Sequence, residues 1–243
     1  MKPHTVTRSL LSRAGLAAAA LALALPVQSL HAQESAPGRG LTAQFEVEFL
    51  KSIIDHHFSA LRMSELAAGT DTTRNAELGR YNEGTSPTPG YAATPAKAQS
   101  GSIRSMARME NRAQREEIDQ ARMYLKNWYG QSHEPQLTDM GRQQIQLLES
   151  TPAGAQFDHA FLETMARHHY MAVTEATECL VAADIKHEAL HRYCAGIQHE
   201  QLRSIDEMRD MLCHRFEICD YQPLSGLRGR HTGSASEMGG TGN

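Results

Sequence analysis

The stretch from Phe157 to Leu180, FDHAFLETMARHHYMAVTEATECL, decides the fold, because an earlier stretch carries the same pattern. The earlier stretch runs from Phe45 to Leu66, FEVEFLKSIIDHHFSALRMSEL, and its matching positions all precede the later ones by the same distance along the chain. The residues that recur are Phe45, Phe49, Leu50, His56, His57 and Ala60, matched by Phe157, Phe161, Leu162, His168, His169 and Ala172. Apolar residues in both stretches return every three or four positions, which predicts two helices with wide apolar faces.

Each histidine pair lies within the apolar face of its predicted helix, not opposite it. His56 follows Ile53 and precedes Ala60 at helical spacing, so its ring belongs to the core side. Burying an imidazole without a partner costs about 1 to 3 kcal/mol. We therefore expect both pairs to have hydrogen-bond partners or to bind a metal ion.

The start of the chain, residues 1–32, has the pattern of a secretory signal peptide. Lys2, Arg8 and Arg13 provide a basic start, Ala14 to Leu25 form an apolar stretch, and a short polar end reaches Ala32. This apolar stretch is too short to cross a bilayer, which requires about 20 residues. We expect cleavage near Ala32 and a periplasmic or secreted protein without stable membrane insertion.

The charge of the chain argues against nucleic acid as a partner. Residues 33–243 hold 21 basic and 28 acidic side chains, a net charge near −7 with histidine neutral. Surfaces that bind nucleic acid are usually basic. The remaining length suits one domain, or one duplicated domain, with a buried core, and no strand pattern interrupts it, so we expect an all-α fold.

Changes in composition predict how the chain is organised. A linker at 33–40 leads into a duplicated helical domain at 41–222, and a flexible tail follows at 223–243. Residues 70–101, rich in Thr, Pro, Gly and Ser, are interpreted as a long, partly disordered surface loop inserted into that domain. The expected helices cover about 42–68, 102–128, 137–148, 155 to a turn at 183–186, and 187–212.

All four cysteines, Cys179, Cys194, Cys213 and Cys219, lie in the second half of the chain. In an exported protein an even number of cysteines usually indicates disulfides, and four cysteines allow three pairings. We favour Cys179 with Cys194, which flank a helical hairpin, and Cys213 with Cys219, which close a short loop. Reduced thiols acting as metal ligands are the alternative.

Two repeated helical hairpins predict a four-helix bundle, in which metal sites are built from side chains that face inward. Eleven histidines and ten methionines follow Ala32, many of them on the expected inner faces. Imidazole combined with thioether is a soft donor set that suits copper, especially Cu(I). The candidate ligands are His56, His57, Met63, His168, His169, Met171, His187, His191 and His199.

The turn near 184–186 predicts which residues of the last two helices are level with each other. The second histidine pair is expected to lie level with 199–202, with an uncertainty of about one helical turn. Glu175 and Glu178 are then level with His191 and, together with His187, form a candidate second site for Zn²⁺ or Cu²⁺.

Each of these signals also has an interpretation without metal. Histidines on an apolar face are commonly hydrogen-bonded within the core, and methionine packs adaptably. The second hypothesis is therefore a structural or partner-binding helical module, with a protein partner or a second copy of the chain. A di-iron oxidase would require two Glu-x-x-His patterns, whereas the chain has one, Glu188 to His191, so the sequence does not favour an enzyme of that kind.

The two histidine-pair segments resemble the signature of the domain-of-unknown-function 305 family. FDHAFLETMARHH followed by Ala172, and FEVEFLKSIIDHH followed by Ala60, are similar to two copies of that signature. A second-helix pattern is also similar, through Gln114, Glu117, Ile118, Tyr124 and Leu125. The resemblance covers about Leu41 to Leu212 apart from the insertion, and it implies an exported, ferritin-like bundle.

This resemblance also implies a metal-binding function, since some relatives bind copper or silver through histidine and methionine. Carried over by position, the implied ligands are both histidine pairs, with Met63 after the first pair. The second copy departs from the first, because Glu175 stands where Met63 stands. The resemblance therefore does not imply that the two copies bind metal in the same way.

Overall fold

The structure is a computed structural model that describes residues 41–73, 85–183 and 185–223. Its helices are α2 (Leu41–Ala68), α3 (Gly101–Tyr129), α4 (Asp139–Ser150), α5 (Ala155–Val181) and α6 (Glu188–Phe216). The described residues contain no strand, so the expected all-α class is confirmed. The expected signal peptide, the linker at 33–40 and the tail from residue 224 onward lie outside the described residues.

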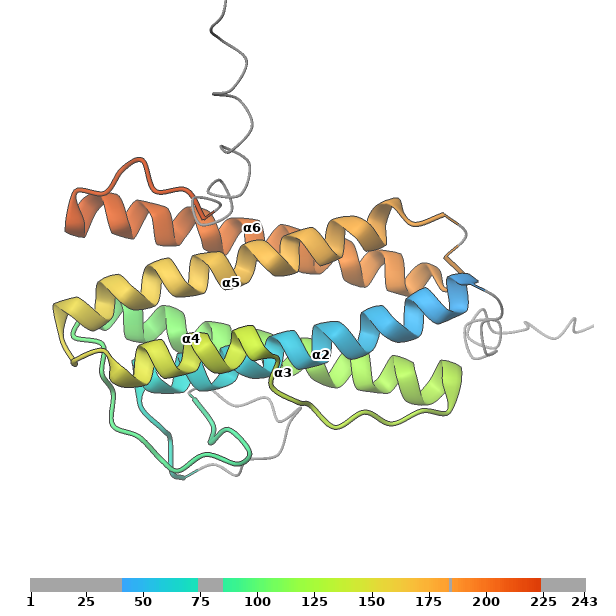
Figure 1. The fold of residues 1–243 in the computed structure, drawn as a ribbon, viewed down its shortest axis with the longest axis horizontal. Helices are drawn as coiled ribbons and strands as arrows, with labels where there is room; N and C mark the ends of the chain where they lie inside the picture. The colour runs from blue at the N-terminus through green and yellow to red at the C-terminus, as the bar shows by residue number, and fades with distance from the viewer. Residues whose placement is uncertain (1–40, 74–84, 184, 224–243) are drawn as a thin grey trace, which may run out of the picture.

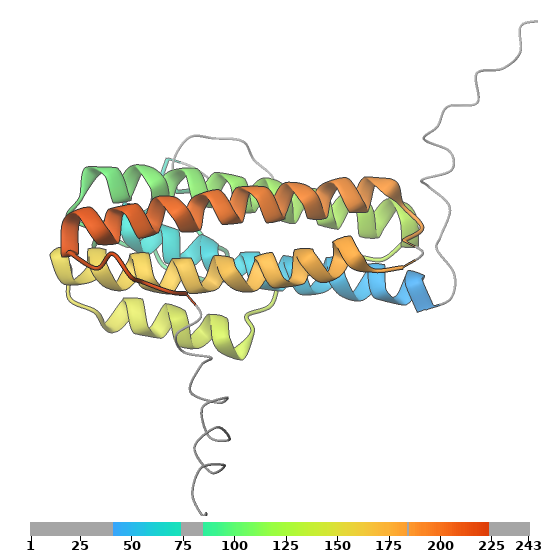
Figure 2. The same ribbon diagram turned by 90° about the horizontal axis from the view of Figure 1, so that it is seen from above.

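The four long helices pack as two antiparallel pairs, α2 with α3 and α5 with α6 (Figure 1). The two pairs meet where α2 packs against α5, and the short helix α4 lies along the outer side of both (Figure 2). Seen from above, α3 and α6 run next to each other on the opposite side. Helices α2 and α5 run in opposite directions, and their histidine pairs, near the middle of each helix, meet where the two helices pack (Figure 1).

Local capping determines where the helices begin and end. The Ser100 side chain accepts a hydrogen bond from the Ile103 N–H at the start of α3, and Gly130, with φ of 64°, ends that helix in the left-handed conformation. Thr138 caps α4 in the same way as Ser100 caps α3. Because of this cap, α4 begins and ends two residues later than the expected 137–148.

The apolar core is divided into two halves by a polar layer. One half includes Ile53, Leu125 and Trp128, near the start of α2 and the start of α6. The other half includes Met63, Phe161 and α4 residues such as Leu148. On α5 the histidine pair falls between the two groups in sequence, and on α2 it falls within the first group, between Ile54 and Phe58. Their rings thus occupy the middle of the helical core.

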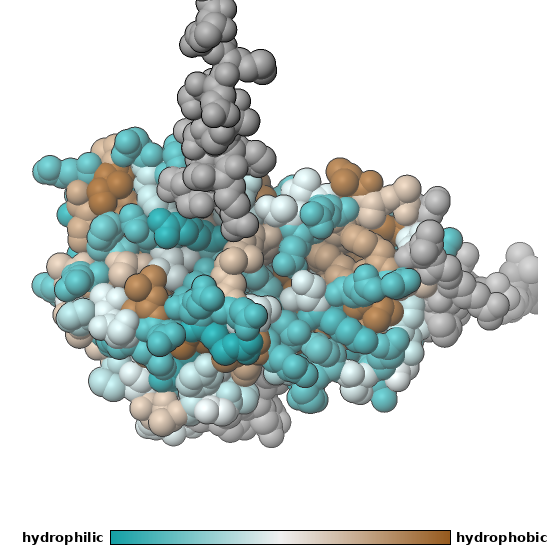
Figure 3. Space-filling model, viewed as in Figure 1, coloured by the Kyte–Doolittle hydropathy of each residue, from teal (hydrophilic) through white to brown (hydrophobic). Residues whose placement is uncertain are grey.

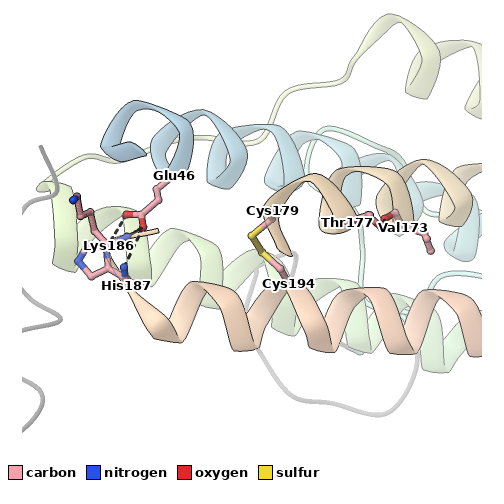
Figure 4. Close-up of a disulfide and its surroundings, with 7 residues drawn as sticks. All are labelled: Glu46, Val173, Thr177, Cys179, Lys186, His187 and Cys194. Atoms are coloured by element: carbon pink, nitrogen blue, oxygen red, sulfur yellow. Dashed lines mark hydrogen bonds and ion pairs between the residues drawn. A yellow bond between two sulfur atoms is a disulfide. The ribbon is translucent and has the colours of Figure 1, made fainter. Parts of the chain in front are cut away.

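Two buried carboxylates at corresponding positions join one hairpin to the other. Glu46 of α2 accepts hydrogen bonds from the backbone N–H groups of Lys186 and His187, at 2.6 and 3.1 Å, where α6 begins (Figure 4). Asp158 of α5 accepts from the backbone N–H groups of Gln99 and Ser100, at 2.9 and 3.0 Å, where α3 begins. Each carboxylate therefore satisfies amide groups that a helix start leaves without intrahelical partners.

Both expected disulfides are present. Cys179 is bonded to Cys194, which links the end of α5 to the start of α6 (Figure 4). Cys213 is bonded to Cys219 and closes the turn after α6. The described residues contain no free cysteine. The cysteines are therefore bonded to each other, and the alternative of thiol metal ligands is wrong.

Residues 85–100, within the expected inserted loop, make buried contacts with the helices. The buried Arg115 guanidinium donates to the carbonyl groups of Ser86 and Pro87, both at 2.9 Å. The buried Glu65 carboxylate accepts from the Thr88 N–H at 3.2 Å and from Arg62 at 3.1 Å. Composition did not predict this packing, because the charged residues that hold the loop lie on α2 and α3.

The exposed surface of the described residues is mainly polar. In the view of Figure 3 hydrophilic residues cover most of the surface, and hydrophobic residues form small separate groups. None of the described helices is both long enough and apolar enough to cross a membrane.

Candidate functional site

His56 and His168 stand at the centre of the polar layer. Their rings stack with centroids 3.8 Å apart. The Nε2 of His56 lies 3.1 Å from the carbonyl oxygen of His168, and the Nε2 of His168 lies 3.1 Å from the carbonyl oxygen of His56. The Ser59 hydroxyl, which donates to the same His56 carbonyl at 2.8 Å, accepts from the His168 Nε2 at 2.9 Å. Helices α2 and α5 are thus joined by a reciprocal pair of imidazole–backbone hydrogen bonds.

The outer histidine of each pair turns toward a carboxylate of α3. The Nε2 of His169 donates to Glu110 Oε2 at 3.0 Å, and the Ser204 hydroxyl of α6 donates to Glu110 Oε1 at 2.5 Å. The Nε2 of His57 lies 2.9 Å from Glu117 Oε2, but the two groups are not aligned as a hydrogen bond. Both rings are fully buried, whereas the Glu110 and Glu117 side chains are 14% and 16% exposed.

Several buried polar atoms in this layer have no hydrogen-bond partner. They include the Nδ1 atoms of His57, His168 and His169, and both amide atoms of Gln114 on α3. For His168 and His169, Nε2 faces an acceptor and must carry the proton, so we assign to Nδ1 the free lone pair. A buried polar atom without a partner costs about 1 to 3 kcal/mol. The layer therefore holds unused acceptor capacity.

Burial keeps the stacked rings neutral. Burial, followed by the neighbouring His57 and His169 rings, lowers the pKa of His56 from 6.5 to about 3. Burial, followed by repulsion from the neighbouring histidine rings, holds the pKa of His168 well below its ordinary value. Burial alone would raise the pKa of Glu110, but the contacts with His169 and Ser204 lower it below its ordinary value. The His56 and His168 rings are therefore expected to be neutral, and the Glu110 carboxylate ionised, at neutral pH.

The remaining candidate ligands lie elsewhere. Met63 is fully buried in the apolar half of the core that includes α4, and Met171 is half-buried on α5. His187 is buried near the start of α6, where its Nδ1 lies 2.8 Å from Glu46 Oε2 and its ring stacks on Trp128 with centroids 4.0 Å apart. His191 and His199 are exposed on α6, so the expectation that they face inward is wrong.

The last two helices are displaced from the expected level by an amount close to the one-turn uncertainty of that expectation. Gln198 donates to Thr177 at 2.8 Å, and Ser204 shares Glu110 with His169. The α6 residues opposite the second histidine pair are therefore near Ser204 and not at 199–202. Glu175 accepts a hydrogen bond from Ser52 at 3.2 Å, while His187 bonds to Glu46. The contacts of the described residues do not bring Glu175 and His187 together as a second site.

No three His, Cys, Asp or Glu side chains among the described residues are arranged to hold one metal ion. Two of the four central rings, His168 and His169, nevertheless fit a metal by their chemistry. Histidine ligands commonly donate one ring N–H to a carboxylate or a carbonyl group and bind the metal through the other nitrogen. In His168 and His169 one nitrogen already faces such an acceptor and the other is unpartnered.

The carboxylates that complete this layer were not predicted as site residues. Glu110 and Glu117 are two helical turns apart on α3, on either side of Gln114. This spacing places the three side chains on one face of the helix, which is the signal that could have identified them. The position of Glu46 carried a similar signal, because the repeat that matches His56 with His168 also matches Glu46 with Asp158.

Fold and site define an all-α protein with a layer of buried imidazole and carboxylate groups across its core. A comparison with family profiles matches residues 91–212 to the family described as Domain of unknown function (DUF305). This match covers just over half of the chain, and the protein belongs to that family. It includes His168, His169, Glu110 and Glu117, while the first histidine pair precedes the matched residues.

Two solved structures are similar to this chain. CopM in the Cu(II)-bound form is 19% identical, with a TM-score of 0.50, over 68% of this chain and 93% of that chain. CopM in the Cu(I)-bound form is 18% identical, with a TM-score of 0.49, over 70% of this chain and 96% of that chain. At these identities the likeness concerns the fold. No curated protein sequence matches.

Proposed function

We propose that this protein is an exported copper-binding protein that sequesters or delivers the ion. Its fold is proposed to be a ferritin-like four-helix bundle of two repeated hairpins. The observation that carries the copper proposal is the set of buried, unpartnered Nδ1 atoms on His57, His168 and His169. The signal-peptide pattern of residues 1–32 supports export to the periplasm or beyond.

The repeated-hairpin proposal is supported by reciprocal contacts. Glu46 and Asp158, which occupy corresponding positions, each accept from the backbone at the start of a helix in the other hairpin. His56 and His168, which also correspond, each donate to the other's carbonyl group. Reciprocal contacts of this kind are expected where two similar halves pack around a local two-fold axis.

Copper is favoured over harder cations by the donors that are present. The unpartnered atoms include imidazole nitrogens of three histidines, and Met63 and Met171 follow the two histidine pairs in the sequence. Imidazole suits copper and zinc, and thioether suits Cu(I), whereas hard cations prefer oxygen. Similarity of fold to CopM, solved with copper bound, is compatible with this choice. Because no three donors converge in the described arrangement, binding is expected to move the rings.

The test is metal titration of residues 33–243 with both disulfides intact. Cu(I), Cu²⁺ and Zn²⁺ are titrated separately into the unchanged chain, into His57→Gln/His169→Gln, and into the surface control His191→Gln/His199→Gln. The proposal expects copper to bind the unchanged chain and the control equally and to bind the site variant less. Equal copper stoichiometry in all three proteins would refute the site.

A structural or partner-binding module is the second candidate, favoured by the reciprocal hydrogen bonds of His56 and His168. These bonds join α2 to α5 without any metal. Thermal melting separates the two functions, because a ligand that binds only the native state raises the melting temperature. A copper protein melts higher with copper and returns to its original melting temperature with a chelator, whereas a metal-free module responds to neither.

A further inference from the structure

A groove between α3 and α6 leads from solvent to one of the buried histidines. Its volume is about 290 Å³, and its lining includes Glu117, Tyr124, Tyr193, Gly196 and Glu200. Glu117 is the lining residue that contacts the site, since its Oε2 lies 2.9 Å from the Nε2 of the fully buried His57. One carboxylate therefore separates this ring from the groove.

The polar atoms behind Glu117 are unsatisfied. Neither ring nitrogen of His57 has a hydrogen-bond partner, and neither amide atom of Gln114 has one. Gln114 is fully buried and lies three residues before Glu117, on the same face of α3. Buried polar groups normally have partners, so this cluster offers unused polar atoms to a ligand.

Glu110, the second carboxylate of α3, differs from Glu117 in its hydrogen bonds. Glu110 accepts hydrogen bonds from His169 and from the Ser204 hydroxyl, so both of its oxygens are occupied. Glu117 makes no side-chain hydrogen bond through Oε2, although the Tyr193 hydroxyl donates to its backbone carbonyl at 2.8 Å and holds this turn of α3 in place. Of the two carboxylates, Glu117 is the one that lines the groove, and its buried Oε2 faces His57 without an aligned hydrogen bond.

The charges around the groove favour a cation. Glu200 is ion-paired with Arg203 at 2.5 Å, and Arg192, the guanidinium in the lining, is ion-paired with Glu188 at 2.9 Å, so Glu117 is the lining carboxylate that has no arginine partner among the described ion pairs. A volume of this size holds an ion with part of its hydration shell, since one water occupies about 30 Å³ in the liquid. Carboxylate oxygens bind hydrated metal cations and repel anions, which fits an ion on its way to an imidazole.

We propose that this groove is the access site for copper, where the ion first binds Glu117 and then passes to His57. This inference rests on the proposed copper-binding function and adds the route and the residue that receives the ion. Binding at Glu117 exchanges part of the ion's water shell for carboxylate oxygen, and transfer to His57 exchanges that oxygen for an imidazole nitrogen. Neither exchange changes the oxidation state of the copper.

Gly196 offers a direct test, because it lines the groove and a Cβ added there meets no atom within 4 Å. Gly196→Phe fills the groove, and Gly196→Ala is the matched control that leaves it open. Cu²⁺ is mixed rapidly with each full protein, residues 33–243, and quenching of the single tryptophan, Trp128, is followed. Trp128 stacks at 4.0 Å on Tyr124, which lines the groove. We expect Gly196→Phe to bind about tenfold more slowly, with the same copper stoichiometry at equilibrium, while Gly196→Ala binds at the original rate.

Glu117→Gln provides a second variant, with the exposed Asp119→Asn of the same helix as its charge-matched control. We expect Glu117→Gln to slow association several-fold and to weaken its dependence on salt, because an attracting charge at the groove is lost. Copper binding at the original rate in both Gly196→Phe and Glu117→Gln overturns the route and leaves the proposed function standing. An unchanged chain that binds no copper overturns the proposed function, and the access site with it.

Discussion

His56 of α2 and His168 of α5 stack with ring centroids 3.8 Å apart, and each Nε2 lies 3.1 Å from the other's carbonyl oxygen. This contact joins the two helical hairpins in the middle of the core. Both rings are buried, with 5% and 1% of their surfaces exposed. The packing of one hairpin on the other therefore depends on this pair of residues.

Replacing either stacked histidine with alanine is expected to lower the free energy of unfolding by about 2 to 4 kcal/mol, because a cavity forms and a hydrogen bond between helices is lost. The double variant His56→Ala/His168→Ala is expected to lose less than the two single losses added together, since the rings contact each other. Urea unfolding of the metal-free protein measures these changes. His191→Ala on the surface is the control and should stay within about 0.5 kcal/mol. A loss that small at His56 would show that the stack does not hold the hairpins together.

The metal-free protein is expected to lose stability as the pH falls below about 6.5. An unfolded histidine titrates near 6.5, whereas burial lowers the pKa of His56 in the folded protein to about 3. Between these values the unfolded state binds more protons, so acid favours unfolding by about 1 kcal/mol per pH unit for each such histidine. His168 acts in the same direction, because its pKa is also lowered.

Urea unfolding between about pH 7 and pH 5 measures this effect. Glu110 does not contribute in that range, since its pKa lies below the ordinary carboxyl value. The variant His56→Gln/His168→Gln is expected to show a flatter dependence on pH. A variant whose stability falls as steeply as that of the unchanged chain would assign the effect to other groups.

Glu46→Gln and Asp158→Asn are each expected to lower the free energy of unfolding by about 1 to 3 kcal/mol, because each carboxylate is buried and accepts from a helix start. The local effects should differ. Hydrogen exchange should increase at the start of α6 in Glu46→Gln and at the start of α3 in Asp158→Asn. Glu48→Gln, an exposed neighbour on α2, is the control. Increased exchange at the same helix in both variants would contradict the reciprocal capping.

Gly141→Ala is expected to destabilise the protein by about 1 to 3 kcal/mol, although alanine favours helices more than glycine does. A Cβ at position 141 would lie 2.7 Å from Ser59 Cβ, so α4 must move away from α2. Gly196→Ala is the matched control, because the added Cβ there meets no atom within 4 Å, and it should be neutral or stabilising. Urea midpoints of the two variants give the comparison. Equal shifts in both would mean that α4 does not depend on close contact at Ser59.

Local sequence patterns were sufficient for the helices and the disulfides. Apolar periodicity predicted the long helices to within a few residues at most ends, since a helix that packs on a core must repeat its apolar face every turn. The cysteine positions predicted Cys179–Cys194 and Cys213–Cys219, because both bonds connect residues that are close in sequence. The contacts of the inserted loop could not be predicted from local patterns, because Arg115 and Glu65, which bind it, lie far from it in the chain.

The sequence by itself determined that two histidine pairs lie on the core faces of two similar helices, because helical periodicity alone places them there. Only the tertiary structure decided what those rings contact. Spacing gives the face of a helix but not its level against a neighbour, and a shift of about one turn moves the α6 residues opposite His169 from 199–202 to those near Ser204. The contacts of Glu110 and Glu117 with the histidines depend in the same way on how α3 packs against α2 and α5. That arrangement is set by the fit between whole helix surfaces, and a local sequence pattern does not encode it.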